Sequence, residues 1–409
     1  MTHFNSIEKL CAAVCVVAIA VGAPAQDAEK AQRTGKAKYK LVDLGPSGPA
    51  GQPFHITNNG LISAAIAAAD GTDHSFVYVF GRPVDISRPG LRGANSMPFG
   101  NNAAGQVVGG ANTNLADPGG EDFCGFQTLG LPSGTTTCLP FLWQNGRMIA
   151  LPTLDRNQGN NGVANAINDR GEVTGAAENT TFETSCSDYA PTLAQFQRYQ
   201  FKPVVWRRGG VTELATVPGD GVGTGLAINN KGQVAGSSGD CSVFNVQFLI
   251  PIHPLHALFW EEDGTPIEIP SFGGIQPAFG NSAMGINDSG QVVGFSTLPD
   301  NVTFHGFLWN QHTGRLVDLG TAAGMPSSAA IAINDSGVAV GVSQDSMNLV
   351  ATVWEHQKAE DLNTLIPDNS PLYLLIACSI NAEGQIIGLA ADSSGVLHGF
   401  ELDPQDEPR

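Results

Sequence analysis

Residues 283–320 read AMGINDSGQVVGFSTLPDNVTFHGFLWNQHTGRLVDLG, and this stretch decides the fold. It contains four short apolar runs, AMGIN, QVVGFS, HGFLW and RLVDLG, which polar segments separate. Short apolar runs bounded by turn residues predict β-strands. The NDSG between the first two runs supplies a glycine for a positive φ and an asparagine that can cap the backbone, as a tight hairpin requires. The stretch therefore predicts one four-stranded antiparallel sheet.

The hairpin motif Ile-Asn-x-x-Gly returns along the chain. Its clear copies end at Gly171, Gly232, Gly290, Gly337 and Gly384, and weaker copies end at Gly60 and Gly105. The basic spacing of about 46 residues indicates a repeat architecture in which each unit is one supersecondary element. Calcium binding by the Asn-Asp pairs is disfavoured, because a calcium ion takes about six or more oxygens and each copy offers one carboxylate or none.

Three further positions recur with the motif. The third run of each unit carries a large side chain: Trp143, Trp206, Trp260, Trp309 and Trp354, with Tyr78 and Leu402 in the first and last copies. One large ring per unit predicts a packing layer between neighbouring units, with carbohydrate stacking as the alternative. The histidines His74, His256, His305 and His398 also share one position, and their repetition favours a structural role over a convergent metal site.

A glycine closes the second run in six copies: Gly109, Gly175, Gly236, Gly294, Gly341 and Gly388. An isolated glycine inside a strand predicts a bulge or a close approach of another backbone.

The two ends of the chain complete one unit. After the last hairpin the chain makes a third run, Leu397–Leu402, and no fourth. The missing run stands at the start, where YKLVDLG (residues 39–45) matches RLVDLG (residues 315–320). An open solenoid would end in capping units, whereas complementary partial units indicate a closed ring. We therefore predict an all-β fold, a seven-bladed β-propeller of four-stranded antiparallel blades over residues 39–403, closed by the N-terminal strand joining the last blade.

The composition agrees with this prediction. The chain has 409 residues, of which 50 are glycine and 25 proline, and only 14% are charged. These values argue against a coiled coil or a helical bundle, while 42% hydrophobic residues argue against a disordered chain. The net charge of -18 is spread along the sequence and disfavours a nucleic-acid or anionic-membrane surface, since both need basic patches.

The N-terminus predicts export. Residues 10–21 form an apolar run that follows Lys9 and precedes the small residues Ala23-Pro24-Ala25. The run is too short to span a bilayer, and we interpret residues 1–25 as a cleaved signal peptide, with a short buried helix as the alternative. Residues 26–38 are expected to be a flexible leader and residues 404–409 a polar tail. The protein is expected to be secreted, to the periplasm or the extracellular space.

Five cysteines remain after the expected cleavage. In an exported protein these can be oxidised, and an odd number leaves at least one thiol outside intramolecular pairs. We expect the loop cysteines to pair as Cys124 with Cys138 and Cys186 with Cys241, leaving Cys378 as a small buried hydrophobe in a strand.

The repeated runs of this sequence resemble those of the bacterial extracellular proteins with HAF repeats. The name refers to a His-Ala-Phe run before a tryptophan, which residues 305–309 (HGFLW) and 256–260 (HALFW) match closely. The second and third copies depart from it, with Leu139-Pro140-Phe141 and Lys202-Pro203-Val204. The resemblance implies export and a repeat fold, and it transfers neither an activity nor catalytic residues.

Insertions predict the working surface. The distance from the second-run glycine to the tryptophan position is 34, 31 and 24 residues in the second to fourth copies, but 13 to 15 in the last three. Three consecutive blades therefore carry long loops on one face, and such loops are often functional. The candidate ligand-face residues are Asp117, Glu121, Asp122, Phe126, Glu183, Asp188, Tyr189, Tyr199, Asp240 and Phe244. The alternative is that the aromatic ones only pack the loops onto the propeller.

Two functions remain open. The favoured one is a monomeric binding module for a glycan, a peptide or another protein, because nothing in the repeat has catalytic spacing. The other is a secreted glycan-active hydrolase or lyase that uses carboxylates on the same loop face, whose separation would set the outcome. The sequence has no GxSxG, HExxH, P-loop or Cys-x-x-Cys motif, and we expect no metal, no cofactor and no catalytic residue that can be named.

Overall fold

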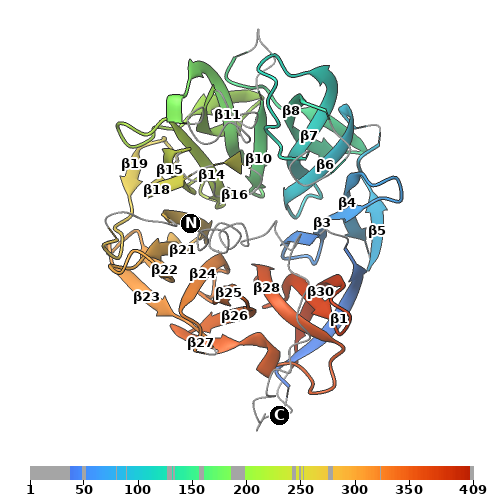
Figure 1. The fold of residues 1–409 in the computed structure, drawn as a ribbon, viewed down its shortest axis with the longest axis vertical. Helices are drawn as coiled ribbons and strands as arrows, with labels where there is room; N and C mark the ends of the chain where they lie inside the picture. Colours follow the sequence, from blue (N-terminus) through green and yellow to red (C-terminus); the bar gives the residue numbers. More distant parts are fainter. Residues whose placement is uncertain are drawn as a thin grey trace, which may run out of the picture.

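The computed structural model describes residues 37–47, 52–79, 81–88, 90–126, 131, 134–155, 161–185, 199–241, 246–247, 250–251, 253–274, 280–322 and 324–405. They form seven four-stranded antiparallel sheets that follow one another around a ring in chain order (Figure 1). The prediction of a seven-bladed β-propeller is confirmed. No helix among the described residues is long and apolar enough to cross a membrane.

Each of the first four blades begins at the inner strand and runs outward. Blade 1 contains β2 (Gln52–Ile56), β3 (Ile62–Ala67), β4 (Asp73–Val79) and β5 (Arg82–Asp85). Blade 2 contains β6 (Arg92–Asn101), β7 (Val107–Ala116), β8 (Thr136–Gln144) and β9 (Arg147–Ala150). Blade 3 contains β10 (Gly162–Ile167), β11 (Val173–Phe182), β12 (Tyr199–Arg207) and β13 (Gly210–Glu213). Blade 4 contains β14 (Val222–Ile228), β15 (Val234–Asp240), β18 (His253–Trp260) and β19 (Pro266–Glu268).

The remaining blades keep the same plan. Blade 5 contains β20 (Asn281–Ile286), β21 (Gln291–Thr297), β22 (Phe304–Asn310) and β23 (Leu316–Gly320). Blade 6 contains β24 (Ser327–Ile333), β25 (Ala339–Gln344), β26 (Leu349–Glu355) and β27 (Lys358–Asp361), followed by the 3-10 helix η2 (Leu362–Thr364). A two-stranded ribbon, β16 (Val246–Gln247) and β17 (Ile250–Pro251), lies in the loop of blade 4.

The first strand of the chain closes the ring. Blade 7 consists of β28 (Leu372–Ile380), β29 (Ile386–Asp392), β30 (Leu397–Pro404) and β1 (Tyr39–Pro46). β1 pairs antiparallel with β30, with Leu41 opposite Leu402 and Tyr39 opposite Pro404 (Figure 1). The ring is therefore joined by backbone hydrogen bonds between the two ends of the described chain.

The Ile-Asn-x-x-Gly motif forms the hairpin between the first and second strands of each blade. In blade 5 the Gly290 amide donates to the Asn287 carbonyl at 3.1 Å, and Gly290 has a φ of 71° that side chains other than glycine rarely adopt. The Asn287 Oδ1 atom accepts the amides of Ser289 and Gln291, at 3.1 and 3.0 Å. The predicted turn chemistry is therefore present, with the asparagine capping the turn from inside.

The same asparagines also join each blade to the next. In six links an Nδ2 atom of one blade donates to a backbone carbonyl of the next, at 2.9 to 3.1 Å: Asn102 to Asn168, Asn168 to Asn229, Asn229 to Asn287, Asn287 to Asn334, Asn334 to Asn381, and Asn381 to Thr57. Asn59 of blade 1 donates to the Ala103 carbonyl of blade 2 and makes the seventh link. A closed ring of hydrogen bonds thus holds the seven hairpins together around the propeller axis.

A β-bulge in the inner strand explains the glycine of the second strand. In blade 5 the register shifts between Ala283 and Gly285, and the Ser282 carbonyl oxygen would lie 1.9 Å from a Cβ atom added at Gly294. The equivalent carbonyl lies 1.9 to 2.1 Å from the added Cβ atom at Gly109, Gly175, Gly236, Gly341 and Gly388. Blade 1 differs, because Ala64 takes this position opposite Pro53. The close backbone approach that the sequence predicts is present at all six glycines.

The tryptophans lie between the sheets. Trp206, Trp260, Trp309 and Trp354 are buried, and Trp143 is half-buried. The Trp260 indole donates to the Ala215 carbonyl at 2.8 Å, and the Trp206 indole donates to the Pro152 carbonyl at 2.6 Å. Both carbonyls belong to the segment that leads from the preceding blade. The repeated indole therefore packs in its own blade and donates a hydrogen bond to the segment that arrives from the preceding blade.

Candidate functional site

The long insertions of blades 2 to 4 lie on one face, which we call the loop face. It carries the connections between the second and third strands, from β7 to β8, from β11 to β12 and from β15 to β18. The hairpins of the Ile-Asn-x-x-Gly motif lie on the opposite face of an antiparallel blade, which we call the hairpin face. The described part of the first insertion is the most complete, so it shows how such a loop is built.

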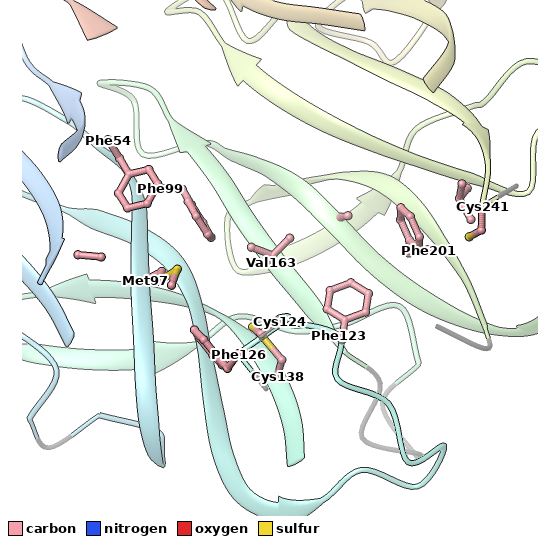
Figure 2. Close-up of a cluster of buried hydrophobic side chains, with 13 residues drawn as sticks. Phe54, Met97, Phe99, Phe123, Cys124, Phe126, Cys138, Val163, Phe201 and Cys241 are labelled. Atoms are coloured by element: carbon pink, nitrogen blue, oxygen red, sulfur yellow. A yellow bond between two sulfur atoms is a disulfide. The ribbon is translucent and has the colours of Figure 1, made fainter. Parts of the chain in front are cut away.

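The first insertion folds back into the propeller. Phe123 and Phe126 are each 1% exposed and belong to a buried cluster with Met97, Val163 and Phe201 (Figure 2). The rings of Phe123 and Phe201 meet edge to face, with centroids 6.0 Å apart. Residues of blades 2 and 3 thus form a core that the insertion covers.

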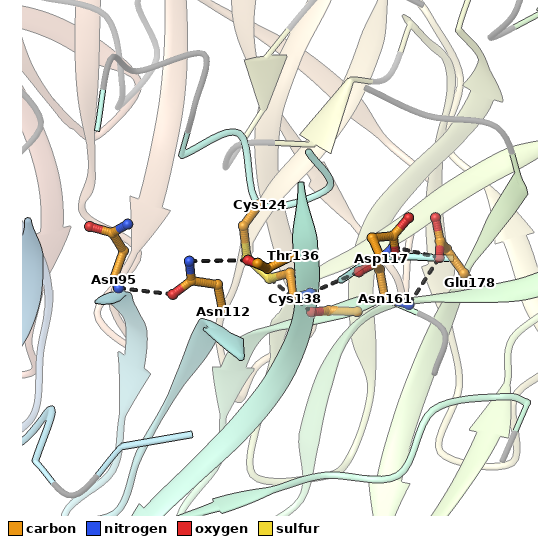
Figure 3. The surroundings of a disulfide bond; sticks show 9 residues. Asn95, Asn112, Asp117, Cys124, Thr136, Cys138, Asn161 and Glu178 are labelled. Carbon is orange, nitrogen blue, oxygen red and sulfur yellow. Dashed lines mark hydrogen bonds between the residues drawn. A yellow bond between two sulfur atoms is a disulfide. The ribbon is translucent and has the colours of Figure 1, made fainter. Parts of the chain in front are cut away.

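A disulfide closes the first insertion. Cys124 and Cys138 are bonded across 14 residues of chain (Figure 3), as the sequence predicts. Cys241 is also disulfide-bonded, and its predicted partner Cys186 lies outside the described residues. Cys378 is a buried thiol in β28. Cross-linking a loop restricts the unfolded chain and stabilises the folded one.

The predicted ligand-face residues of the first insertion are interior residues. Asp117 is 8% exposed, Glu121 0%, Asp122 5% and Phe126 1%. Side chains as buried as these contribute little contact area to a partner on the surface. Their role in this structure is to build the loop.

Three carboxyl groups from two blades meet at Asn161. The Asn161 Nδ2 atom donates to Asp117 Oδ2 and to Glu178 Oε2, both at 2.9 Å, and its backbone amide also donates to Glu178 at 2.9 Å (Figure 3). Glu121 contacts the same Nδ2 atom at 3.5 Å. Asn161 therefore gathers acidic groups from the first insertion and from β11, 17 to 44 residues away in the chain.

One of these carboxyls has a strongly raised pKa. Burial raises the pKa of Glu178 well above its usual range, and the nearby charge of Glu121 raises it further. The side chains of Glu121 and Glu178 share a hydrogen bond, which two ionised carboxylates cannot make. Burial between two blades therefore favours the protonated form of Glu178, which can donate to the Glu121 carboxylate.

Glu178→Gln is expected to make the protein more stable than the native chain at pH 8. The amide keeps an acceptor for Asn161 and a donor for Glu121, so it replaces the protonated acid. In the native chain unfolding lets Glu178 ionise near its unperturbed pKa of 4.5, so the native state loses stability as the pH rises from there towards the raised pKa. The gain at pH 8 should be about 1.4 kcal/mol for each unit by which folding raises that pKa.

Urea unfolding between pH 4 and pH 8 measures this effect. Glu383→Gln is the matched control, because Glu383 is an exposed residue of the blade 7 hairpin. Parallel stability curves for the native chain and the Glu178 variant across this pH range would show that Glu178 is ionised in the folded protein.

The other predicted ligand-face residues differ in their contacts, and three of them lie outside the described residues. Glu183 is half-buried and accepts hydrogen bonds from Ser185 and Gln200, at 2.9 and 3.1 Å. Tyr199 begins β12 and is half-buried. Asp240 ends β15 and pairs with His253 at 3.2 Å. Asp188, Tyr189 and Phe244 lie outside the described residues.

The repeated histidines pair with aspartates, a feature that the sequence analysis missed. In each pair an Nδ1 atom lies 2.8 to 2.9 Å from a carboxylate oxygen: His74 with Asp85, His256 with Asp220, His305 with Asp318, and His398 with Asp43. The hydrogen bond to Asp318 raises the pKa of His305, and that to Asp220 raises the pKa of His256. The recurring VD of the fourth run was the available signal, since Asp43, Asp85 and Asp318 all occupy it. These pairs tie the third strand to a neighbouring segment.

A cavity beside His256 opens between blades 4 and 5. Its volume is about 270 Å³, and its lining includes His256, Glu268, Ser271 and Asn281. Asp220 holds the His256 Nδ1 atom and also accepts the hydroxyl of Ser238. A polar recess thus lies on the loop face next to the third insertion.

Comparison with known proteins finds remote likenesses to solved structures. No family model matches the chain, and no curated protein matches it. Among solved structures, an oligogalacturonate lyase from Vibrio parahaemolyticus is 11% identical, with 89% of this chain and 93% of that chain covered and a TM-score of 0.49. A puromycin-hydrolyzing peptidase from Mycobacterium tuberculosis is 14% identical, with 92% and 55% covered and a TM-score of 0.48.

TolB from Acinetobacter baumannii is 10% identical, with 91% and 81% covered and a TM-score of 0.37. This chain therefore spans about half the length of the peptidase and most of the other two. The resemblance to HAF-repeat proteins stays a prediction from the sequence.

Proposed function

We propose that the protein is exported and acts as a binding module whose loop face takes a peptide or protein partner. The observation that carries this proposal is the position of the most exposed apolar side chains. Leu115 and Phe182, 65% and 54% exposed, lie at the ends of the second strands β7 and β11, and Val302 and Met347, 66% and 74% exposed, lie in the connections that follow second strands, so all four are on the loop face. These four residues stand on one face but on four different blades, and a face with several exposed apolar groups offers contact sites to a partner.

The rest of the surface differs from the loop face. Among the described residues, the other exposed large apolar side chains include Val84, Ile149 and Ile267, which are 36% to 47% exposed and lie in the outermost strands of their blades. Val396, 45% exposed, adds a fifth residue to the loop face, in the connection from β29 to β30. The chain's charge of -18 would favour a partner that combines apolar and basic residues.

The geometry of the carboxyls argues against the hydrolase alternative at this place. Glycosidases separate their two carboxyls by about 5 to 9.5 Å, so that the bond to be broken fits between them. Glu121 and Glu178 instead contact each other and are 0% and 1% exposed. They leave no room for a substrate. Export is supported by the Cys124–Cys138 disulfide, because such bonds persist in oxidising compartments.

Screening the purified chain against peptide, protein and glycan arrays tests the proposal. A retained peptide or protein should bind at least tenfold more weakly to the double variant Leu115→Asp, Phe182→Asp. Val84→Asp, Ile149→Asp is the matched control, because it places the same charges on the outer strands. Equal weakening by both pairs, binding of glycans alone, or turnover of an oligosaccharide would overturn the proposal.

A further inference from the structure

The hairpins of all seven blades surround a polar cavity at the hairpin face, on the side opposite the proposed partner surface. Its volume is about 150 Å³, and it is lined by residues of the seven Ile-Asn-x-x-Gly hairpins and by His55. The rim carries the carboxylates of Asp169, Asp288 and Asp335. No lysine or arginine stands among the described residues that line it. The cavity is therefore negative and has room for a few non-hydrogen atoms.

The wall of the cavity is held in place by hydrogen bonds between blades. The Asp169 Oδ1 atom accepts the Ala103 amide at 3.0 Å, and the Asp335 Oδ1 atom accepts the Asp288 amide at 2.8 Å. Together with the asparagine ring described above, these bonds orient the rim without neutralising its carboxylates. A binding site whose groups are already fixed loses less entropy when a ligand arrives.

His55 breaks the sevenfold repeat at this cavity. It occupies the next-to-last position of the inner strand, where the other blades have only small residues: Gly100, Ala166, Ala227, Gly285, Ala332 and Ser379. Its neighbour Asn101 is a second exception, since it replaces the isoleucine that ends most inner strands. The two exceptions contact each other, with His55 Nδ1 2.8 Å from Asn101 Oδ1.

The partners of Asn101 determine which nitrogen of His55 holds the proton. Asn101 Nδ2 donates to the Leu61 carbonyl at 2.8 Å, so its Oδ1 atom is an acceptor, which also receives the Ser63 hydroxyl. The Nδ1 atom of His55 must therefore donate, and in the neutral ring the Nε2 atom is left with its lone pair. Burial lowers the pKa of His55, which favours that neutral ring.

We infer that this axial cavity binds a primary alkylammonium group. The cavity offers the imidazole lone pair of His55 and the carboxylates of Asp169, Asp288 and Asp335, all of them acceptors, to a cation that brings three N–H donors. Among the described residues no group of three or more His, Cys, Asp or Glu side chains is arranged to hold a metal ion, so the inference concerns an N–H donor and not a coordinated metal. The ammonium group can belong to a free diamine or to a lysine side chain of a partner.

Calorimetric titration of the purified chain with butane-1,4-diamine, with Nα-acetyl-lysine amide and with tetramethylammonium tests this inference. The first two carry ammonium N–H groups, and the third has the charge without them. We expect binding of at least one of the two amines and none of tetramethylammonium. Binding of the diamine alone would identify a free amine as the source, and binding of the lysine derivative would identify a side chain.

Two variants that the repeat itself tolerates make the test specific. His55→Ala installs the residue found in three other blades, and Asp335→Asn installs the residue that stands at this motif position in blades 1 and 4. Each should weaken amine binding at least tenfold and leave the thermal midpoint within a few degrees of the native value. Amine binding that is unchanged in His55→Ala, equal binding of tetramethylammonium, or no binding of either amine at millimolar concentration would overturn the inference.

Discussion

Gly294→Ala is expected to destabilise the propeller by about 3 kcal/mol, the upper part of the range for overpacking a close-packed interior. A Cβ atom at this position would lie 1.9 Å from the Ser282 carbonyl oxygen and 2.9 Å from the Phe307 ring. Ser282 is completely buried, and its carbonyl belongs to a bulged inner strand that packs against the next blade. The strand must therefore move away from the sheet to admit one methyl group. Urea unfolding followed by tryptophan fluorescence measures the loss.

Gly210→Ala is the control for this substitution. Gly210 also lies in a strand, but it is exposed, and the nearest atom to an added Cβ is the Arg207 carbonyl oxygen at 3.7 Å. Its alanine variant should unfold within about 0.5 kcal/mol of the native chain, as surface substitutions usually do. If the two alanine variants were equally stable, the close approach at Gly294 would not constrain the blade.

The architecture was predictable because its signals are local and repeated. Gly290 and its six equivalents mark hairpins through a backbone property that a four-residue window contains. The matching of residues 39–45 with residues 315–320 is likewise a comparison of short strings, and it correctly placed β1 beside β30. Each local signal recurs around the ring, so the other copies supported the interpretation of any one copy.

The hydrogen-bond partners of polar side chains were not predictable in the same way. Asn287 was correctly interpreted as a turn residue, yet its Nδ2 atom also bonds the Asn334 carbonyl, 47 residues away in the next blade. A one-dimensional pattern shows that a residue recurs, but it does not show which neighbour the ring closure brings within 3 Å. The His–Asp pairs were missed for a different reason, because the recurring aspartate of the fourth run was not matched with the recurring histidine of the third.

The acidic residues of the first insertion show a second limit. Asp117 and Glu121 were expected at a surface because they belong to a long insertion, and isolated carboxylates are rarely buried. The structure buries them by supplying Asn161 as a shared donor and Glu178 as a partner with a raised pKa. Neither compensation is visible in sequence, since the partners lie 40 and more residues along the chain. Residue type predicts that a carboxylate is exposed, and only the folded structure shows where one is buried.

Trp260→Ala is expected to cost about 3 to 5 kcal/mol, as truncation of a fully buried aromatic ring usually does. Trp260 is 0% exposed and packs with Val205, Leu258 and Leu214 between blades 3 and 4. Its removal leaves a cavity and also deprives the Ala215 carbonyl of the indole donor. Chemical unfolding monitored by far-UV circular dichroism measures the loss without depending on the deleted fluorophore.

Two further variants separate the parts of this effect. Trp260→Phe keeps a six-membered ring in the site but lacks the five-membered ring and its N–H, so it should lose about 1 to 3 kcal/mol. Trp143→Ala removes the same ring from a half-buried site in blade 2 and should cost clearly less than Trp260→Ala, because the cost of truncation follows the area that leaves contact. Equal losses for the two alanine variants would mean that the ring stabilises each blade alone, by its fit within one sheet, and that packing against the neighbouring blade adds little. A larger loss for Trp260→Ala than for Trp143→Ala would instead show that the tryptophans stabilise the interface between blades.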